Sequence, residues 1–267
     1  MDSIKRSCVT FSQLGKFGRL GNCIFQIAAT IGYASLTNKC YSFPEWDGAK
    51  YFPNLPIGND PKEFTTINEP HFHWALLPKV DGNVSLHGYF QSEQYFRGLE
   101  SVIKQTFTFT DDIQQHCQEE LTKIYKDGWD KIVSIHLRFG DYVNNPFYVD
   151  LTKTSYYLDA IRYVESHTQP GLKIKYLVFS DDNEMANGFI RNIPFLWDEV
   201  KVVESPTPGH AMCLMSLCDA GIMANSSFSW WGNYLGKDKK IISPKSWFGP
   251  SAGLDTKDLY TEKMIKI

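Results

Sequence analysis

The spacing of apolar residues changes along the chain, and the change comes near Gly128. Before it, apolar residues recur at i, i+3, i+4 and i+7 from Ile24 to Ile31, which predicts an amphipathic helix over residues 22–36. A loop with glycines at 15, 18 and 21 precedes that helix. Residues 41–80 are rich in Pro, Gly and Asn without a clear period, so we expect loops there.

After Gly128, expected strands and helices alternate. The first strand–helix pairs are residues 131–138 and 154–167, then 173–180 and 181–192, and the pattern continues through 200–204, 209–220, 220–225, 227–236 and 239–244. Alternation with short connections predicts a parallel sheet covered on both faces, an α/β fold. We therefore expect two domains, a loop-rich lobe over residues 1–128 and a ligand-binding lobe over 129–267.

Composition narrows the class of protein. The 267 residues are 43% hydrophobic and 21% charged, which excludes disorder and coiled coil, and a net charge of -3 gives no sign of a nucleic-acid partner. The six cysteines lack zinc spacing and are typical of free thiols in a reducing compartment. With no secretory leader and no apolar run of membrane-spanning length, we expect a soluble, cytoplasmic protein. Peripheral membrane contact and the oligomeric state stay open.

Polar residues gather where three of the expected strands end. Ligands of such sheets bind beyond the carboxyl ends of the strands, and a turn rich in hydroxyls and amides before a helix suits a phosphate. The candidates are His136, Arg138 and Asp141 after the first strand, Ser180, Asp181 and Asp182 after the second, and Asn225, Ser226 and Ser227 after a later one.

Each cluster also has a structural interpretation. Arg138 can pair with Asp141 at the surface, and Asp181, Asp182 or Ser226 can cap a helix. Trp230 and Trp231 are aromatic candidates for a sugar platform, but they fit a core better. The functional interpretation is favoured because all three clusters fall at the same edge of one expected sheet.

Familiar nucleotide, hydrolase and metal motifs do not match. The glycines of GKFGRLG are each separated by two residues, which fits neither dinucleotide nor P-loop spacing, and G-x-S-x-G is absent. There is no D-x-D motif, and Glu45-Trp46-Asp47 comes nearest to one. Because an arginine can meet the charge of a diphosphate, we expect no metal and no other cofactor.

Five segments in order carry a family resemblance: GRLGNCIFQIA, HGYFQSEQYF, SIHLRFGDYV, YLVFSDD and ANSSFSWWGNYL. Together they resemble the alpha-1,2-fucosyltransferase family, glycosyltransferase family 11, from about residue 15 to the end. The resemblance implies a GT-B architecture of two Rossmann-like lobes and a cleft between them. It also implies transfer of fucose from GDP-fucose, with inversion, to a glycan hydroxyl such as the 2-OH of a terminal beta-galactoside. A transferase with another nucleotide sugar or linkage, and an inactive carbohydrate-binding relative, are the alternatives.

The resemblance also implies roles for single residues. Arg138 would hold the beta-phosphate of GDP, with His136 supporting the same pocket and Asp182 facing the nucleoside. Further donor-binding residues would be Gly21 and Asn22 from the first lobe, with Asp181, Asn225, Ser226, Ser227 and Phe228 from the second.

The general base is not identified by the sequence. Asp141 is a candidate by position, and Glu45, His87 and Glu93 are weaker candidates on the acceptor side. One departure from the family stands out, since Phe139 replaces the usual second arginine. Strand alternation places His136 and Arg138 on one face and turns Phe139 toward apolar packing.

Overall fold

The computed structural model describes residues 6–193 and 199–267, which form two compact units. Unit 1 runs to Thr110 and also takes in Leu254–Thr261, and unit 2 comprises Asp111–Gly253 and Glu262–Ile267. The division therefore differs from the expected boundary near Gly128. Helix α3 (Asp111–Lys126) belongs to unit 2 because its buried face, which includes Cys117 and Leu121, packs against α6 (Pro208–Leu217).

Unit 1 contains a four-stranded parallel sheet in the order β2-β1-β4-β3. The strands are short, and of three further helical segments one lies between β2 and β3 and two follow β4. Their bounds are Cys8–Thr10 (β1), Cys40–Tyr41 (β2), Thr65–Asn68 (β3), Val84–His87 (β4), Asp47–Tyr51 (η1), Glu93–Phe96 (η2) and Glu100–Thr106 (α2). The expectation of loops throughout residues 41–80 is thus wrong for η1 and for β3. The four residues of β3 include a single buried one, Ile67, too little for a visible period.

Helix α1 (Leu20–Thr37) is the expected helix and packs on this sheet. It begins two residues earlier than predicted, so Gly21 lies in its first turn rather than in the preceding loop. The helix is buried on nearly all sides from Cys23 to Ala34. At Gly32 it comes so close to the backbone carbonyl of Tyr95 that a Cβ would collide with it.

Unit 2 contains a six-stranded parallel sheet in the order β10-β9-β8-β5-β6-β7. Strands β5, β6 and β7 follow one another outward from the centre of the sheet. Strands β8, β9 and β10 then follow one another outward on the other side of β5. The order therefore reverses between β5 and β8, where such sheets bind ligands. The strands are Lys131–Leu137 (β5), Ile174–Ser180 (β6), Val200–Val202 (β7), Ala220–Ile222 (β8), Lys240–Ser243 (β9) and Met264–Lys266 (β10).

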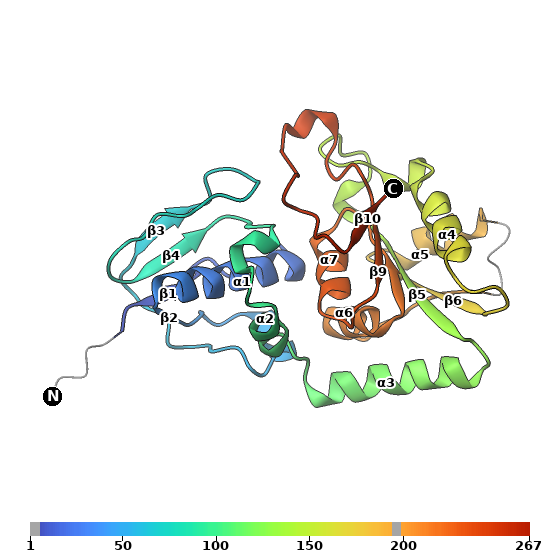
Figure 1. Cartoon of the computed structure of the whole chain (residues 1–267), viewed down its shortest axis with the longest axis horizontal. Helices are drawn as coiled ribbons and strands as arrows, with labels where there is room; N and C mark the ends of the chain where they lie inside the picture. Colours follow the sequence, from blue (N-terminus) through green and yellow to red (C-terminus); the bar gives the residue numbers. More distant parts are fainter. Residues whose placement is uncertain (1–5, 194–198) are drawn as a thin grey trace. The chain divides into compact units, whose positions relative to one another are not determined.

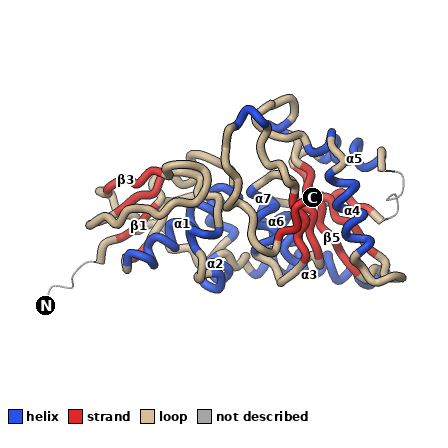
Figure 2. Tube along the Cα trace, turned by 45° about the horizontal axis from the view of Figure 1, so that its top comes forward, coloured by secondary structure: helices blue, strands red, loops and turns tan. Residues whose placement is uncertain are grey.

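Helices cover both faces of this sheet. Figures 1 and 2 show α4 (Tyr156–Ser166) and α5 (Asn183–Arg191) on one face, with α6 and α7 (Ser227–Tyr234) on the other. Short 3-10 turns occupy Gly140–Tyr142, Leu151–Lys153 and Pro250–Ala252. Trp230 and Trp231 of α7 are fully buried, which confirms that they belong to the core.

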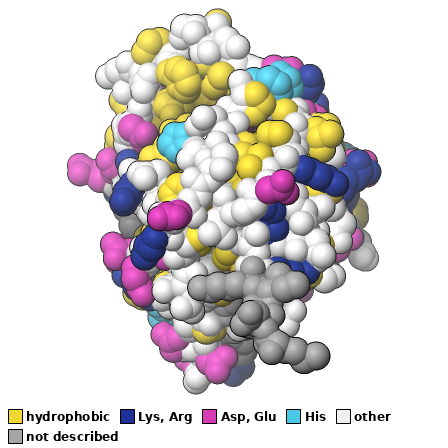
Figure 3. Space-filling model, turned by 90° about the vertical axis from the view of Figure 1, so that its left-hand side faces the viewer, with side chains coloured by type: hydrophobic (Ala, Val, Ile, Leu, Met, Phe, Trp, Pro, Cys, Tyr) yellow, Lys and Arg dark blue, Asp and Glu magenta, His cyan; other side chains and the backbone are white. Residues whose placement is uncertain are grey.

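The predicted strand–helix series is confirmed in unit 2, where each expected segment overlaps an observed element. The final strand, β10, was not predicted. None of the helices in the described part of the chain is long and apolar enough to cross a membrane. Figure 3 shows acidic and basic side chains scattered together over one face, in keeping with the small net charge.

Candidate functional site

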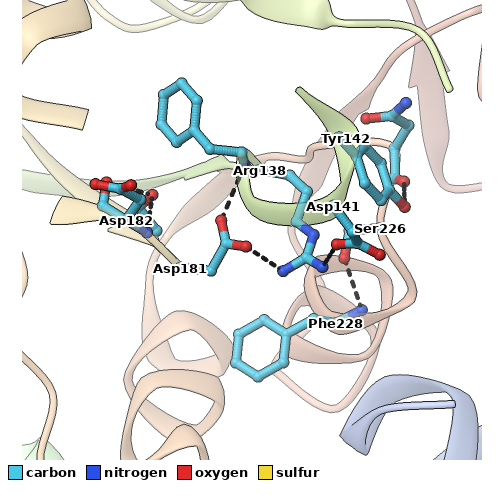
Figure 4. Close-up of polar contacts among 10 residues, drawn as sticks. Arg138, Asp141, Tyr142, Asp181, Asp182, Ser226 and Phe228 are labelled. Atoms are coloured by element: carbon cyan, nitrogen blue, oxygen red, sulfur yellow. Dashed lines mark hydrogen bonds and ion pairs between the residues drawn. The ribbon is translucent and has the colours of Figure 1, made fainter. Parts of the chain in front are cut away.

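Arg138 follows β5 at the point where the strand order reverses. Its guanidinium lies between two carboxylates, with Nη1 2.5 Å from Asp181 Oδ2 and Nη2 paired with Asp141 Oδ1 (Figure 4). The side chain of Arg138 is only 10% exposed, against 51% for Asp141. The expected pair of Arg138 with Asp141 is therefore present, but the arginine is largely buried rather than solvated at the surface.

Asp181 joins the ends of two neighbouring strands. Besides holding the guanidinium, it accepts a hydrogen bond at Oδ1 from the backbone N–H of Phe139 at 2.9 Å. A Cβ at Gly140 would collide with Asp181 Oδ2, so this turn needs glycine. The guanidinium carbon also lies 5.1 Å from the centre of the Tyr142 ring, a favourable cation–π distance. Together these contacts fix the direction in which Arg138 points.

Asp182, in contrast, caps a helix. It is the N-cap residue of α5 and accepts at Oδ1 from the backbone N–H of Met185 at 2.9 Å. Its own backbone N–H donates to the hydroxyl of Ser180. The structural alternative for Asp182 is therefore observed, and its role toward a nucleoside stays a prediction.

His136 lies on the face of β5 opposite the apolar core that α4 and α5 cover. Burial, and then the charge of Arg138, lowers its pKa to about 3, so the ring is neutral at pH 7. Nδ1 has no hydrogen-bond partner among the described residues, and the ring centre lies 5.5 Å from that of Phe228. Leu137 and Phe139 pack into the core instead, which confirms the predicted alternation.

The turn after β8 is held by buried hydrogen bonds. Asn225 donates from Nδ2 to the carbonyls of Val149 (3.0 Å) and Trp247 (2.8 Å), so its side chain secures neighbouring loops. Its own carbonyl accepts from the Tyr142 hydroxyl at 2.8 Å, which connects this turn to the Arg138 loop.

Ser226, next along the chain, is the N-cap of α7 and accepts from the backbone N–H of Phe228. Ser227 is the first residue of that helix. The capping alternative for Ser226 is therefore observed. An N-capped helix beginning beside a buried arginine has the partial positive charge that favours an anion.

The hydroxyl groups of two tyrosines in α4 bond to backbone carbonyls at or near the ends of the central strands. The Tyr157 hydroxyl donates to the carbonyl of His136 at 2.8 Å. The Tyr156 hydroxyl contacts the carbonyls of Met223 (2.7 Å) and Ile242 (3.1 Å), beyond β8 and within β9. The edge that carries Arg138 is thus fixed before any ligand arrives. The sequence placed Tyr156 and Tyr157 at the start of a predicted helix but did not show that they bond to the strand ends.

The candidates of unit 1 lie in the first turn of α1, at the end of β4, in η2 and in the loop before η1. Asn22 accepts at Oδ1 from Gln91 Nε2 at 2.9 Å, and Gly21 is buried beside it in α1. His87 ends β4 with an exposed side chain, and Glu93 begins η2. Glu45 is exposed in the loop before η1.

One functional candidate of unit 1 was not predicted. Glu69 directly follows β3 and accepts from the backbone N–H groups of Tyr89 (2.7 Å) and Phe90 (2.8 Å). Burial raises its pKa to about 7, although both hydrogen bonds act in the opposite direction. Its position after a strand too short to predict left no signal in the sequence.

The described residues contain no group of three or more His, Cys, Asp or Glu side chains arranged to hold a metal ion. What unit 2 presents is a buried, preoriented guanidinium beside the start of a helix. That arrangement is suited to binding an anionic group such as a diphosphate.

Comparison with known proteins points the same way. The model of glycosyl transferase family 11 matches residues 72–252. An alpha-1,2-colitosyltransferase of Escherichia coli is 35% identical over 70% of this chain and 64% of its own length. A galactoside 2-alpha-L-fucosyltransferase of Caenorhabditis elegans is 30% identical over 58% of this chain and 43% of its own. The chain thus spans less than two thirds of either relative.

Among solved structures, the alpha-1,6-fucosyltransferase NodZ, in crystals soaked with GDP-fucose, superimposes with a TM-score of 0.57. The match covers 93% of this chain and 97% of NodZ at 15% sequence identity. At that identity the likeness concerns the fold. It confirms the predicted α/β class of GT-B type, built from parallel sheets.

Proposed function

Because the chain belongs to glycosyl transferase family 11, we propose that it is an inverting fucosyltransferase that uses GDP-fucose. The acceptor is a glycan hydroxyl, the 2-OH of a terminal beta-galactoside. Two relatives named for alpha-1,2 or 2-alpha transfer support the linkage, and NodZ crystals soaked with GDP-fucose support the donor.

The observation that carries the proposal is the setting of Arg138. Transfer breaks the bond between fucose C1 and the beta-phosphate oxygen, and that oxygen keeps the electron pair. Negative charge therefore grows on the departing GDP, and a guanidinium fixed at this position stabilises the transition state more than the ground state. Arg138 has this fixation from Asp181, Tyr142 and the strand end itself.

The two carboxylates have different parts in this scheme. Asp141, half exposed, occupies the side of the guanidinium that a diphosphate takes over on binding. Asp181, 20% exposed and bonded to the Phe139 N–H, stays in place and keeps Arg138 oriented. The acceptor hydroxyl attacks C1 from the opposite face and gives its proton to a general base, for which Asp141, Glu45, His87 and Glu93 remain candidates.

No metal takes part in the proposed reaction, since Arg138 supplies the positive charge at the leaving group. Activity should therefore persist in EDTA. Loss of activity on chelation, with recovery on adding Mg²⁺ or Mn²⁺, would contradict this part of the proposal.

A second donor is favoured by a specific observation, because the relative with 35% identity is named for colitose. A site that accepts a colitosyl nucleotide would use the same arginine, because the diphosphate is shared. The two candidates therefore differ only in the sugar transferred.

The test is a transfer assay followed by proton NMR, with lactose as acceptor and GDP-fucose, GDP-mannose or GDP-colitose as donor. A new alpha-anomeric signal with GDP-fucose and substitution at the galactose 2-hydroxyl are expected. Selective use of GDP-mannose would assign another transferase activity. GDP binding without turnover on any glycan of a broad panel would indicate an inactive relative.

A further inference from the structure

We infer that unit 1 carries a sugar-binding subsite made of the rings of Phe17, His87 and Tyr89, called here the aromatic shelf. Its ligand is the pyranose ring of the acceptor glycan, an identification that rests on the proposed function. The shelf lies where β4 ends and where the loop before α1 runs alongside it.

The ring of Phe17 contacts each of the other two rings. The Phe17 ring centre lies 4.6 Å from that of Tyr89 and 5.3 Å from that of His87, with the latter pair nearly parallel at 25°. His87 is exposed, Tyr89 is 39% exposed and Phe17 is half-buried. Rings held at a surface in this way match the apolar C–H face of a sugar.

A buried glutamine ties together the two segments that carry the rings. Gln26 of α1 is fully buried and donates from Nε2 to the carbonyls of Phe17 and Gly88, both at 3.3 Å. Beneath the shelf, the buried ring of Phe11 packs against Phe17 and against Phe90. The relative position of the rings is thus set by the interior of the unit.

The loop after β4 is also held in a conformation that costs free energy. Phe90 has a φ of +51°, a left-handed geometry that side chains other than glycine seldom adopt. Glu69 stabilises it by accepting from the N–H groups of Tyr89 and Phe90, and a Cβ at Gly88 would collide with the Glu69 side chain. Strain retained in this way is typical of functional positions.

The polar groups near the shelf suit a neutral sugar. Asn22 and Gln91, joined by a hydrogen bond of 2.9 Å, belong to the same two segments as the rings. Amide side chains both donate and accept, as hydroxyl recognition requires.

Saturation-transfer NMR on the full chain without a donor tests the shelf directly, with lactose and N-acetyllactosamine as probes. In the wild type we expect saturation to reach the galactose ring protons. Tyr89→Ala should reduce this signal at least about fivefold, and Tyr89→Phe should keep it, because the ring persists. Tyr125→Ala is the matched control, since Tyr125 of α3 is also 39% exposed but lies in unit 2.

Kinetics separate this inference from the proposed function. Tyr89→Ala should raise the KM for lactose about tenfold and leave the KM for GDP-fucose unchanged. Sugar binding that depends on Tyr89, without any transfer from GDP-fucose, would contradict the proposed function and support the shelf. Saturation transfer that is absent in the wild type, or unchanged in Tyr89→Ala with its melting temperature preserved, would overturn the shelf.

Discussion

The two units carry different kinds of side chain at the carboxyl ends of their parallel strands. In unit 2 the ends carry Arg138 between two carboxylates, held by tyrosine hydroxyls from below. In unit 1 they carry rings and amides, with a half-buried acid, Glu69, that bonds only to backbone in the contacts described above. The same kind of sheet edge thus provides a fixed charge in one unit and a neutral apolar surface in the other. The first suits a diphosphate and the second suits a sugar ring.

The largest expected effect comes from removing the charge of unit 2. Arg138→Ala should lower kcat/KM for GDP-fucose by roughly a hundredfold or more, as loss of a preoriented group at a growing charge does. Arg138→Lys should recover little, because an ammonium cannot reproduce the planar fork that Asp181 and Asp141 hold. Steady-state kinetics check both variants. Near-normal turnover in Arg138→Ala would refute the assignment.

The next effect concerns the orientation of that charge. Asp181→Asn keeps an oxygen for the Phe139 N–H but loses the ionic contact with Arg138, so kcat/KM should fall roughly tenfold through misplacement of the guanidinium. Asp141→Asn should leave GDP affinity equal or higher, because its carboxylate competes with the diphosphate. GDP affinity and the donor KM of both variants are the measurements. Equal loss of GDP affinity in both would contradict the division of roles.

A smaller catalytic effect is expected at Phe139, which is 3% exposed in the core of unit 2. Phe139→Arg should leave kcat/KM within roughly tenfold of wild type, since the side chain points away from Arg138. Its cost is stability, about 1–3 kcal/mol, because the new charge is buried. A denaturation midpoint and the donor KM test this, and a large gain in donor affinity would show that the side chain faces the diphosphate.

The smallest effect is a difference in pH dependence between the units. Glu69 has its pKa raised to about 7 from 4.5, so its stabilisation is full below pH 4.5 and is lost as pH rises through 7. His136, lowered to about 3 from 6.5, acts oppositely, with stabilisation present above pH 6.5 and lost as pH falls toward 3.

Calorimetry from pH 5 to 8 tests the Glu69 part of this difference. The Tm of the wild type should fall by a few degrees relative to that of Glu69→Gln, whose neutral side chain does not titrate. Parallel curves for the two proteins would show that the Glu69 carboxyl titrates near its ordinary pKa.

The two units also differ in how much of their structure could be predicted from the sequence. In unit 2 the two central strands, β5 and β6, have seven residues each, which is long enough for the strand pattern to show, so these strands, the placement of Arg138 and the inward turn of Phe139 were all predictable. In unit 1 the strands have two to four residues, too few for a period, and Glu69 follows one of them.

Other contacts depend on packing between distant segments. Nothing local to Asp181 shows that it, and not its neighbour, meets Arg138 from the next strand. Likewise, the bonds from Gln26 to the carbonyls of Phe17 and Gly88 join residues up to 62 positions apart. The family resemblance indicated the type of reaction, but the bonding partners of Arg138 and Gln26 could be identified only from the three-dimensional structure.

Calorimetric titration with GDP and with guanosine tests most directly whether Arg138 binds the diphosphate of the donor. The wild type should bind GDP more tightly than guanosine, because only GDP carries the charge that the guanidinium meets. Arg138→Ala should abolish most of that preference while leaving guanosine binding unchanged. If the variant kept the full preference for GDP, another group would hold the diphosphate and the role assigned to Arg138 would be wrong.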